Sequence, residues 1–367
     1  MIMKNNLLSL NQFFFIIIQT QIGIGVISLP YDLHQVSKQN GWISLIISIF
    51  LIQIIILIFW LMYNRFPTLN LYDMQMIIYG KWIGQSINFL YVLYFVFVGS
   101  LILILFSNLI NLWVLPHTPY WVNMLFLLLS CVYLSSSHIT VIGRIYTFLS
   151  TFFIILFVLL LNAIPELKIY YLFPIAKEGI MPILKGVNQS VLALLGFVVI
   201  LFVLPVVKGT AKQKLKTMSG AIWFVGFFYL FVVFISFTFF STEEIKVVPQ
   251  PVLYLLKSFE FAVVSRIDLL FLTIWIMSVA TSFSTFLYLA SLGTMQLFKS
   301  KKRTKFVWVN ATLIFLLVIV IDSKLITIQT YAKYVSNSGY IFSIALPILL
   351  YLVMLLLKKR HKEGHSS

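Results

Sequence analysis

Long apolar stretches, separated by short polar or charged ones, run through almost the whole chain. A helix that crosses the hydrocarbon core of a bilayer, about 30 Å thick, needs about 20 mostly apolar residues. Within the apolar stretches Asp, Glu, Lys and Arg are absent, except for Arg144 and Asp268 near two ends. The pattern predicts an all-α integral membrane protein with ten transmembrane helices, at about residues 10–30, 41–64, 83–113, 120–137, 141–162, 186–207, 218–240, 268–298, 306–321 and 337–357.

The composition supports this class. The 367 residues are 61% hydrophobic and 10% charged, whereas a soluble domain carries roughly 25% charged residues. The single cysteine, Cys131, lies in an apolar run, which excludes a disulfide or a thiolate metal site and predicts a small core residue. Lys4 precedes an apolar stretch, as in a signal peptide, but no small-x-small cleavage site follows, so we expect a retained first helix.

The distribution of charge predicts the orientation, because cytoplasmic loops are enriched in Lys and Arg. With the N-terminus inside, 17 of the 26 basic residues face the cytoplasm, including the clusters at 208–216, 299–305 and 358–362. The net charge of +16 then divides into +15 inside and +1 outside, and both termini are cytoplasmic. We interpret the basic excess as a topology signal with contacts to anionic membrane lipid, and we expect no nucleic-acid partner.

Two loops carry amphipathic patterns. On the predicted inner side, Asn70–Trp82 mixes apolar and charged positions as a short interfacial helix does. On the outer side, Pro249–Arg266 places Leu253, Leu256, Phe259 and Val263 at helical spacing. Each segment is either an interfacial cap or a contact with another subunit.

Ten helices divide into two sets of five with opposite orientation. This is the plan of the inverted-repeat transporters, whose solute site lies mid-membrane between discontinuous helices. The fold class we predict is therefore a 5+5 inverted repeat with discontinuous helices one and six. It forms one domain over residues 1–367, with a first repeat at about 10–162, a second at about 186–357, and a basic tail at 358–367.

The sequence contains helix-breaking residues where this plan needs them. Gly23 and Gly25 lie in the middle of the first segment and Pro30 follows. Glycine is unfavourable in a helix interior and proline lacks an amide hydrogen. Backbone groups freed there find partners where they line a cavity, and free amides bind carboxylates. The alternative is close packing of helices through small residues.

The sixth segment has a weaker version of the same signal, with Gly196 and Pro205. Hydroxyl groups of other segments are candidates to converge on the breaks, and the alternative is that they bond to the backbone of their own helix. These are Tyr91 and Tyr94 in the third segment, and Thr281, Ser282, Ser284 and Thr285 in the eighth.

Several short motifs resemble the spore germination permeases, the B subunits of GerA-type germinant receptors, within the amino acid–polyamine–organocation (APC) superfamily. The resemblance covers essentially the whole chain. It rests on Gly23-Ile24-Gly25 followed by Ser28-Leu29-Pro30, Gly80-Lys81-Trp82-Ile83-Gly84, Leu195-Gly196 followed by Leu204-Pro205 and a lysine run, Pro251-Val252, Lys257-Ser258-Phe259-Glu260, and Tyr340-Ile341-Phe342.

The resemblance implies a membrane subunit that senses a small nutrient germinant, an amino acid or similar, in the spore inner membrane. It also implies two partners, a larger A-type membrane subunit and a C-type lipoprotein subunit. The residues carried over as ligand-binding are Gly23, Gly25, Ile27, Tyr94, Val98, Leu195, Gly196, Thr281 and Ser282.

The chain differs from the family that it resembles in one charged position. Some relatives have an acidic residue just after the sixth-helix glycine, where this chain has Phe197-Val198-Val199. We expect no buried carboxylate in the chain and hence no proton relay through Asp or Glu.

Two functions other than sensing are compared with the sequence pattern here: transport and catalysis. A secondary transporter of amino acids or related solutes is the alternative on the same fold. An enzyme is not expected, because the five histidines have no metal-ligand spacing and neither a G-x-S-x-G motif nor a P-loop occurs. We therefore predict no catalytic residue, metal or cofactor.

Overall fold

The computed structural model describes residues 7–259, 266–321 and 325–357. Within these ranges every regular element is a helix, apart from an isolated backbone pairing of Leu8 with Val207. The elements in chain order are α1 (Leu10–Gln21), η1 (Ile24–Val26), α2 (Leu29–Ser37), η2 (Lys38–Asn40), α3 (Gly41–Arg65), α4 (Leu71–Tyr79), α5 (Lys81–Trp113), α6 (Tyr120–Ser136), α7 (Ile139–Ser150), α8 (Phe153–Leu161), η3 (Ile164–Glu166), η4 (Ile169–Leu172), α9 (Met181–Ala193), η5 (Leu195–Val199), α10 (Ile200–Val203), η6 (Leu204–Val206), α11 (Ala211–Phe239), α12 (Pro251–Lys257), α13 (Ile267–Leu297), α14 (Thr304–Val320), α15 (Leu325–Tyr340), η7 (Ile341–Ala345) and α16 (Leu346–Leu356).

In the described part of the chain, six helical stretches are long and apolar enough to span a membrane. The bent pair formed by α9 with η5 to η6 raises the number to seven, and α6 and α14 are shorter apolar helices. An all-helical, multi-pass membrane protein is therefore confirmed. All ten predicted segments fall on helices, but ten crossings and an inverted repeat stay a prediction. The six stretches are Leu29–Arg65, Lys81–Trp113, Ile139–Glu166, Ala211–Phe239, Ile267–Leu297 and Ile326–Leu356.

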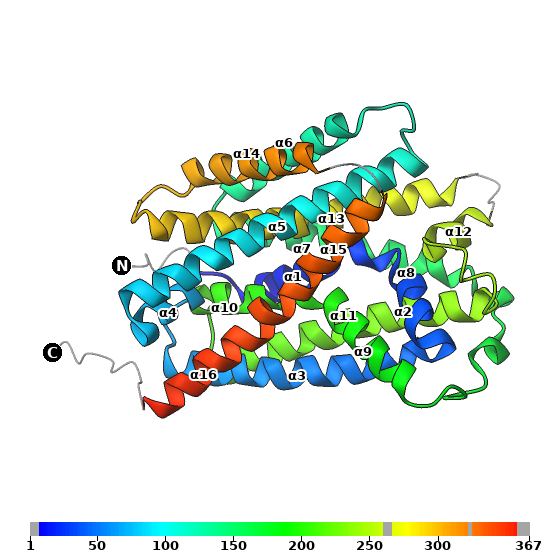
Figure 1. Cartoon of the computed structure of the whole chain (residues 1–367), viewed down its shortest axis with the longest axis horizontal. Coiled ribbons are helices and arrows are strands. Elements are labelled where there is room, and N and C mark those ends of the chain that lie inside the picture. Colours follow the sequence, from blue (N-terminus) through cyan, green and yellow to red (C-terminus); the bar gives the residue numbers. More distant parts are fainter. Residues whose placement is uncertain (1–6, 260–265, 322–324, 358–367) are drawn as a thin grey trace.

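The short helix α1 lies in the middle of the bundle, among the longer α3, α5, α11 and α13 (Figure 1). It starts with a capping box, in which Ser9 and Gln12 bond each other's backbone amides. From Ile16 to Gln21 every residue of α1 is buried, and the helix contacts α7, α11 and α13.

The two amphipathic loops lie at opposite ends of the bundle (Figure 1). In α4, Leu71, Met74 and Ile78 are buried, and the helix packs on α5. In α12, Leu253 and Leu256 are buried against α11 and α13. Most of the apolar residues of the two helices therefore pack on the bundle itself. Val263 and Glu260, part of the second predicted segment, lie outside the described residues.

Backbone hydrogen bonds join the segment before α1 to the segment after η6. The Leu8 amide donates to the Val206 carbonyl at 2.9 Å, and the Lys208 amide donates to the Leu8 carbonyl at 2.8 Å. This pairing lies toward the α4 end, away from α2 and α12. It ties the start of the first predicted repeat to the end of the sixth helix.

The lone cysteine is a core residue, as predicted. Cys131 is buried in α6, and its thiol donates to the Ala280 carbonyl on α13 at 3.4 Å. It packs two helices together and has no access to solvent.

Candidate ligand cavity at the helix breaks

The first helix is broken where the glycines predicted it. After α1 ends at Gln21, Ile22 takes an extended conformation (φ −79°, ψ 96°) and a single 3₁₀ turn, η1, follows Gly23. The chain becomes helical again at Leu29, with Pro30 in the first turn of α2. Proline is tolerated there because its missing amide hydrogen would have had no partner.

The carbonyls freed by this break accept hydrogen bonds from side chains of other helices. Buried carbonyls need partners, and α11 and α13 supply a phenol, an indole and a hydroxyl. Ser282 donates to the Thr20 carbonyl at 3.0 Å, Tyr229 to the Gln21 carbonyl at 2.8 Å, and Trp275 to the Gly23 carbonyl at 3.2 Å.

The second break lies between α9 and η5, where the two pieces of the sixth helix meet at 46°. Gly196 sits in this break, against the first one. A Cβ at Gly196 would lie 2.6 Å from the Thr20 carbonyl oxygen, closer than real Cβ contacts. Only glycine fits at this position, because the two backbones approach each other closely. This agrees with the alternative given above, in which small residues allow helices to pack closely.

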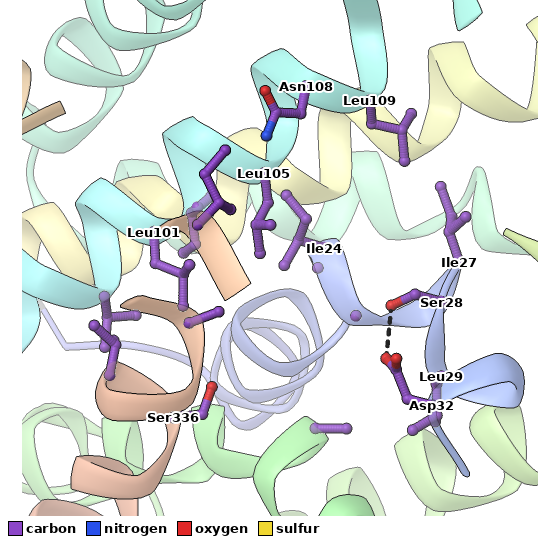
Figure 2. A pocket seen from close by; sticks show the side chains of 18 of the residues that line it. Ile24, Ile27, Ser28, Leu29, Asp32, Leu101, Leu105, Asn108, Leu109 and Ser336 are labelled. Carbon is purple, nitrogen blue, oxygen red and sulfur yellow. Dashed lines mark hydrogen bonds between the residues drawn. The ribbon is translucent and has the colours of Figure 1, made fainter. Parts of the chain in front are cut away.

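A cavity of about 1320 Å³ lies between the two breaks and α5, α13 and α15. Its deep end reaches Thr20 and Ser282, and its other end reaches Pro119 and Pro249, in the loops near α2 and α12. The cavity thus runs from the centre of the bundle to one end. Figure 2 shows Leu101 and Leu105 of α5 facing the turn that carries Ile24.

Eight of the nine residues predicted to bind ligand line this cavity. Gly25 stands out, because a Cβ there would meet no atom within 4 Å. Tyr94 stacks on Phe342 with ring centroids 4.7 Å apart, so one face of its ring is already covered. The eight are Gly23, Gly25, Ile27, Tyr94, Val98, Leu195, Gly196 and Ser282.

The ninth residue, Thr281, is absent from the lining. Its hydroxyl donates to Gln19 Oε1 at 2.6 Å and to the Ser278 carbonyl at 2.9 Å, and the side chain is fully buried. The other hydroxyls considered from the sequence are also outside the lining. These are Tyr91, which donates to the Phe342 carbonyl, Ser284, and Thr285, which donates to the Thr281 carbonyl.

The expectation that the chain has no buried carboxylate is wrong. Asp268 is fully buried in the first turn of α13 and pairs with Arg266 at 2.7 Å. Asp32, in the first turn of α2, lines the cavity and accepts a hydrogen bond from Ser28 at 3.0 Å. Figure 2 shows the two side chains pointing toward each other.

Asp32 is not among the predicted site residues because it lies beyond the first predicted segment, which ends at Pro30. The signal was present in the sequence as Ser28 and Asp32, a hydroxyl and a carboxylate four residues apart on one helical face. The lining also contains two residues with ionisable nitrogens, His117 and Lys333, and both are exposed.

The fold and the cavity define a multi-pass helical membrane protein with a solute-sized space at two helix breaks. Comparison with known proteins places it more narrowly. The chain belongs to the spore germination permease family, because the family model described as spore germination protein matches residues 7–328.

Curated relatives agree with this family. Spore germination protein YndE of Bacillus subtilis (strain 168) is 28% identical over 78% of this chain and 80% of its own length. Spore germination protein A2 of the same organism is 26% identical over 97% of this chain and 98% of its own. Spore germination protein GerQB of Bacillus cereus is 23% identical over 79% and 80%.

Proposed function

We propose that this protein senses a small nutrient germinant, an amino acid or a similar solute, which binds in the cavity at the helix breaks. The open space at Gly25 carries the proposal, because it leaves the backbone of a helix break accessible from a cavity inside a membrane protein. The first amides of a helical turn have no partner within that turn. Those at the start of η1 can therefore hold a solute carboxylate.

Binding acts by changing a conformational equilibrium that partner subunits detect. A solute shifts such an equilibrium only through different affinities for the two states. The partners we propose are an A-type membrane subunit and a C-type lipoprotein subunit, in the spore inner membrane. Spores that carry this protein without its A-type partner should not respond to nutrient, and a full response from the protein alone would rule out the subunit role.

The site test replaces Gly25 by valine. Gly25→Val fills the open space with a branched side chain, so the germination response to an amino-acid mixture should fall sharply while the protein level stays near normal. Loss of dipicolinate and immunoblots measure the two quantities. An unchanged dose response at normal protein level would place the site elsewhere.

The matched control is Gly220→Val on α11. A Cβ at Gly220 meets only Phe14, at 3.7 Å, which is ordinary contact, and the residue is exposed. Gly99→Val on α5 is unsuitable as a control. A Cβ at Gly99 would lie 2.9 Å from Ile314 and 3.3 Å from Phe283, so that change disturbs packing by itself.

For the membrane arrangement we propose ten crossings in a 5+5 inverted repeat of the APC type, with both termini cytoplasmic. The ten helical segments and the cavity between the first and sixth of them support this. Lys212→Cys and Ser300→Cys should resist an impermeant thiol reagent added from outside, and strong labelling would overturn the orientation. Lys214 is unsuitable for labelling because it is buried.

The alternative is a secondary transporter of amino acids or related solutes. The cavity that runs from the centre of the bundle to one end is also compatible with transport. A transporter must also open toward the α4 end, where Leu8 pairs with Val206 and Lys208. Uptake of labelled amino acids by proteoliposomes of this protein alone would support transport and remove the need for partner subunits.

A further inference from the structure

A small notch lies at the α4 end of the molecule, where α5 begins and α13 ends (Figure 1). Its volume is about 30 Å³. Its two exposed residues are lysines, Lys81 at the start of α5 and Lys299 just after α13. The rest of the lining is partly or fully buried and consists of Met76, Gln85, Asn88, Gln296 and Leu297.

Neither lysine has an anionic partner. The ion pairs among the residues that the structure describes, those of Glu243 and Asp268, do not include them. Lys81 Nζ lies 5.9 Å from the centroid of the Trp82 ring. Two ammonium groups that come from different helices, share one notch and lack a counter-ion are suited to bind an anion.

The buried side of the notch lacks a donor. Asn88 is 2% exposed, its Nδ2 donates to the Tyr72 carbonyl at 3.1 Å, and its Oδ1 has no hydrogen-bond partner. The notch is large enough for a water-sized group, which can donate to this oxygen. Asp73 of α4 is outside the lining, where Gln296 donates to it, so this carboxylate does not pair with either lysine.

The surroundings of the notch are those of a membrane interface. Trp82 is 82% exposed, Ile83 59% and Phe298 72%. Exposed aromatic residues at the ends of spanning helices lie at the level of the lipid headgroups, and both α5 and α13 are long and apolar enough to span. An anion in the notch would therefore lie beside acyl chains, which favours a lipid over dissolved phosphate.

The basic cluster at 299–305 is not uniform. Arg303 donates to the Ser137 carbonyl at 2.7 Å and lies 4.2 Å from the centroid of the Tyr288 ring, so it fastens α14 to the end of α6. Only Lys299 of this cluster lines the notch. The other basic residues of the cluster are exposed and outside the lining: Lys301, Lys302 and Lys305.

From these contacts we infer that the notch binds the phosphate of an anionic glycerophospholipid, such as phosphatidylglycerol, between Lys81 and Lys299. Basic pockets between spanning helices bind anionic headgroups on the cytoplasmic side, which is the side of this notch in the orientation proposed above. The start of α5 adds free amides, because Gly80 provides no side-chain cap. A lipid bound there joins α5 to α13, two helices that form the wall of the ligand cavity.

The test measures thermal unfolding of the purified full chain in detergent with added phosphatidylglycerol, phosphatidylcholine or inorganic phosphate at equal ionic strength. Phosphatidylglycerol should raise the melting temperature at lower concentration than phosphatidylcholine, and inorganic phosphate should not raise it. Lys81→Gln combined with Lys299→Gln should weaken the apparent affinity for phosphatidylglycerol about 30-fold, from a factor of about five for each lysine.

The matched control is Lys301→Gln combined with Lys302→Gln. It removes the same charge from the same loop, outside the notch, and should weaken the affinity much less. If the variant with both notch lysines replaced does not fold, Lys299→Gln alone decides, because Lys299 is exposed and lies after the end of α13. It should weaken the affinity about fivefold, and an unchanged affinity would overturn the inference.

Three further results would overturn it. Equal affinity for phosphatidylglycerol and phosphatidylcholine would exclude an anion site. Equal loss in the two double variants would mean that the whole basic cluster attracts lipid diffusely. Stabilisation by inorganic phosphate that requires Lys81 and Lys299 would mean a site for a dissolved anion. The notch is separate from the ligand cavity, so none of these results changes the standing of the proposed function.

Discussion

The two helix breaks face each other, but their glycines have opposite surroundings. Gly25 opens onto the cavity, whereas Gly196 lies against the Thr20 carbonyl. The first break frees carbonyls that polar side chains of α11 and α13 bond, and the second is apolar, with Phe197, Val198 and Val199 all buried. One break therefore provides a polar surface, and the other provides the close contact that holds this surface in place.

The largest effect should follow from a side chain at the close contact. A Cβ at Gly196 would lie 2.6 Å from the Thr20 oxygen and 2.8 Å from its carbon, both backbone atoms that cannot rotate away. We expect Gly196→Val to cost more than about 3 kcal/mol, the upper range of overpacking. Size-exclusion chromatography of the detergent-solubilised protein should show little folded material. Normal yield would mean that the second break is not a rigid support.

An intermediate effect should follow from removing one donor to the first break. Tyr229→Phe leaves the Gln21 carbonyl without its 2.8 Å hydrogen bond, and a buried unpaired acceptor costs about 1–3 kcal/mol. The melting temperature should fall. The control is Ser236→Ala on the same helix, because Ser236 bonds only the Val232 carbonyl of its own helix. If both variants melt alike, the freed carbonyl has found another partner.

The smallest effect on stability should come from Gly25→Ala. The new methyl group meets no atom within 4 Å, and Gly25 is outside the left-handed region. Alanine gives the unfolded chain fewer conformations than glycine does. The free energy of unfolding should therefore stay unchanged or rise by up to about 1 kcal/mol. A clear drop in melting temperature would show that Gly25, like Gly196, serves packing, and the contrast between the two breaks would disappear.

The first break was predictable from sequence because the residues that cause it lie within it. Gly23, Gly25 and Pro30 act on their own backbone, so their effect on a helix needs no knowledge of the partners. The apolar segments were predictable for a similar reason, since length and hydrophobicity decide whether a helix can span a bilayer.

Side-chain direction was not predictable. Thr281 and Ser282 are neighbours, and successive residues of an α-helix point about 100° apart. Both contact α1, but Ser282 bonds the freed Thr20 carbonyl and lines the cavity, whereas Thr281 bonds the Gln19 side chain and is outside the lining. The rotation of α13 that decides this depends on packing along its whole length, which the sequence alone does not reveal.

The pairing of Leu8 with Val206 and Lys208 has a consequence for tolerance to change. Both hydrogen bonds join backbone atoms, so most substitutions at these three positions leave the donors and acceptors intact. Proline in place of Leu8 is different, because it has no amide hydrogen. The link between the start of α1 and the end of η6 is therefore set by the backbone and depends little on side-chain identity, whereas the fully buried Leu8 side chain is constrained separately by its packing in the core.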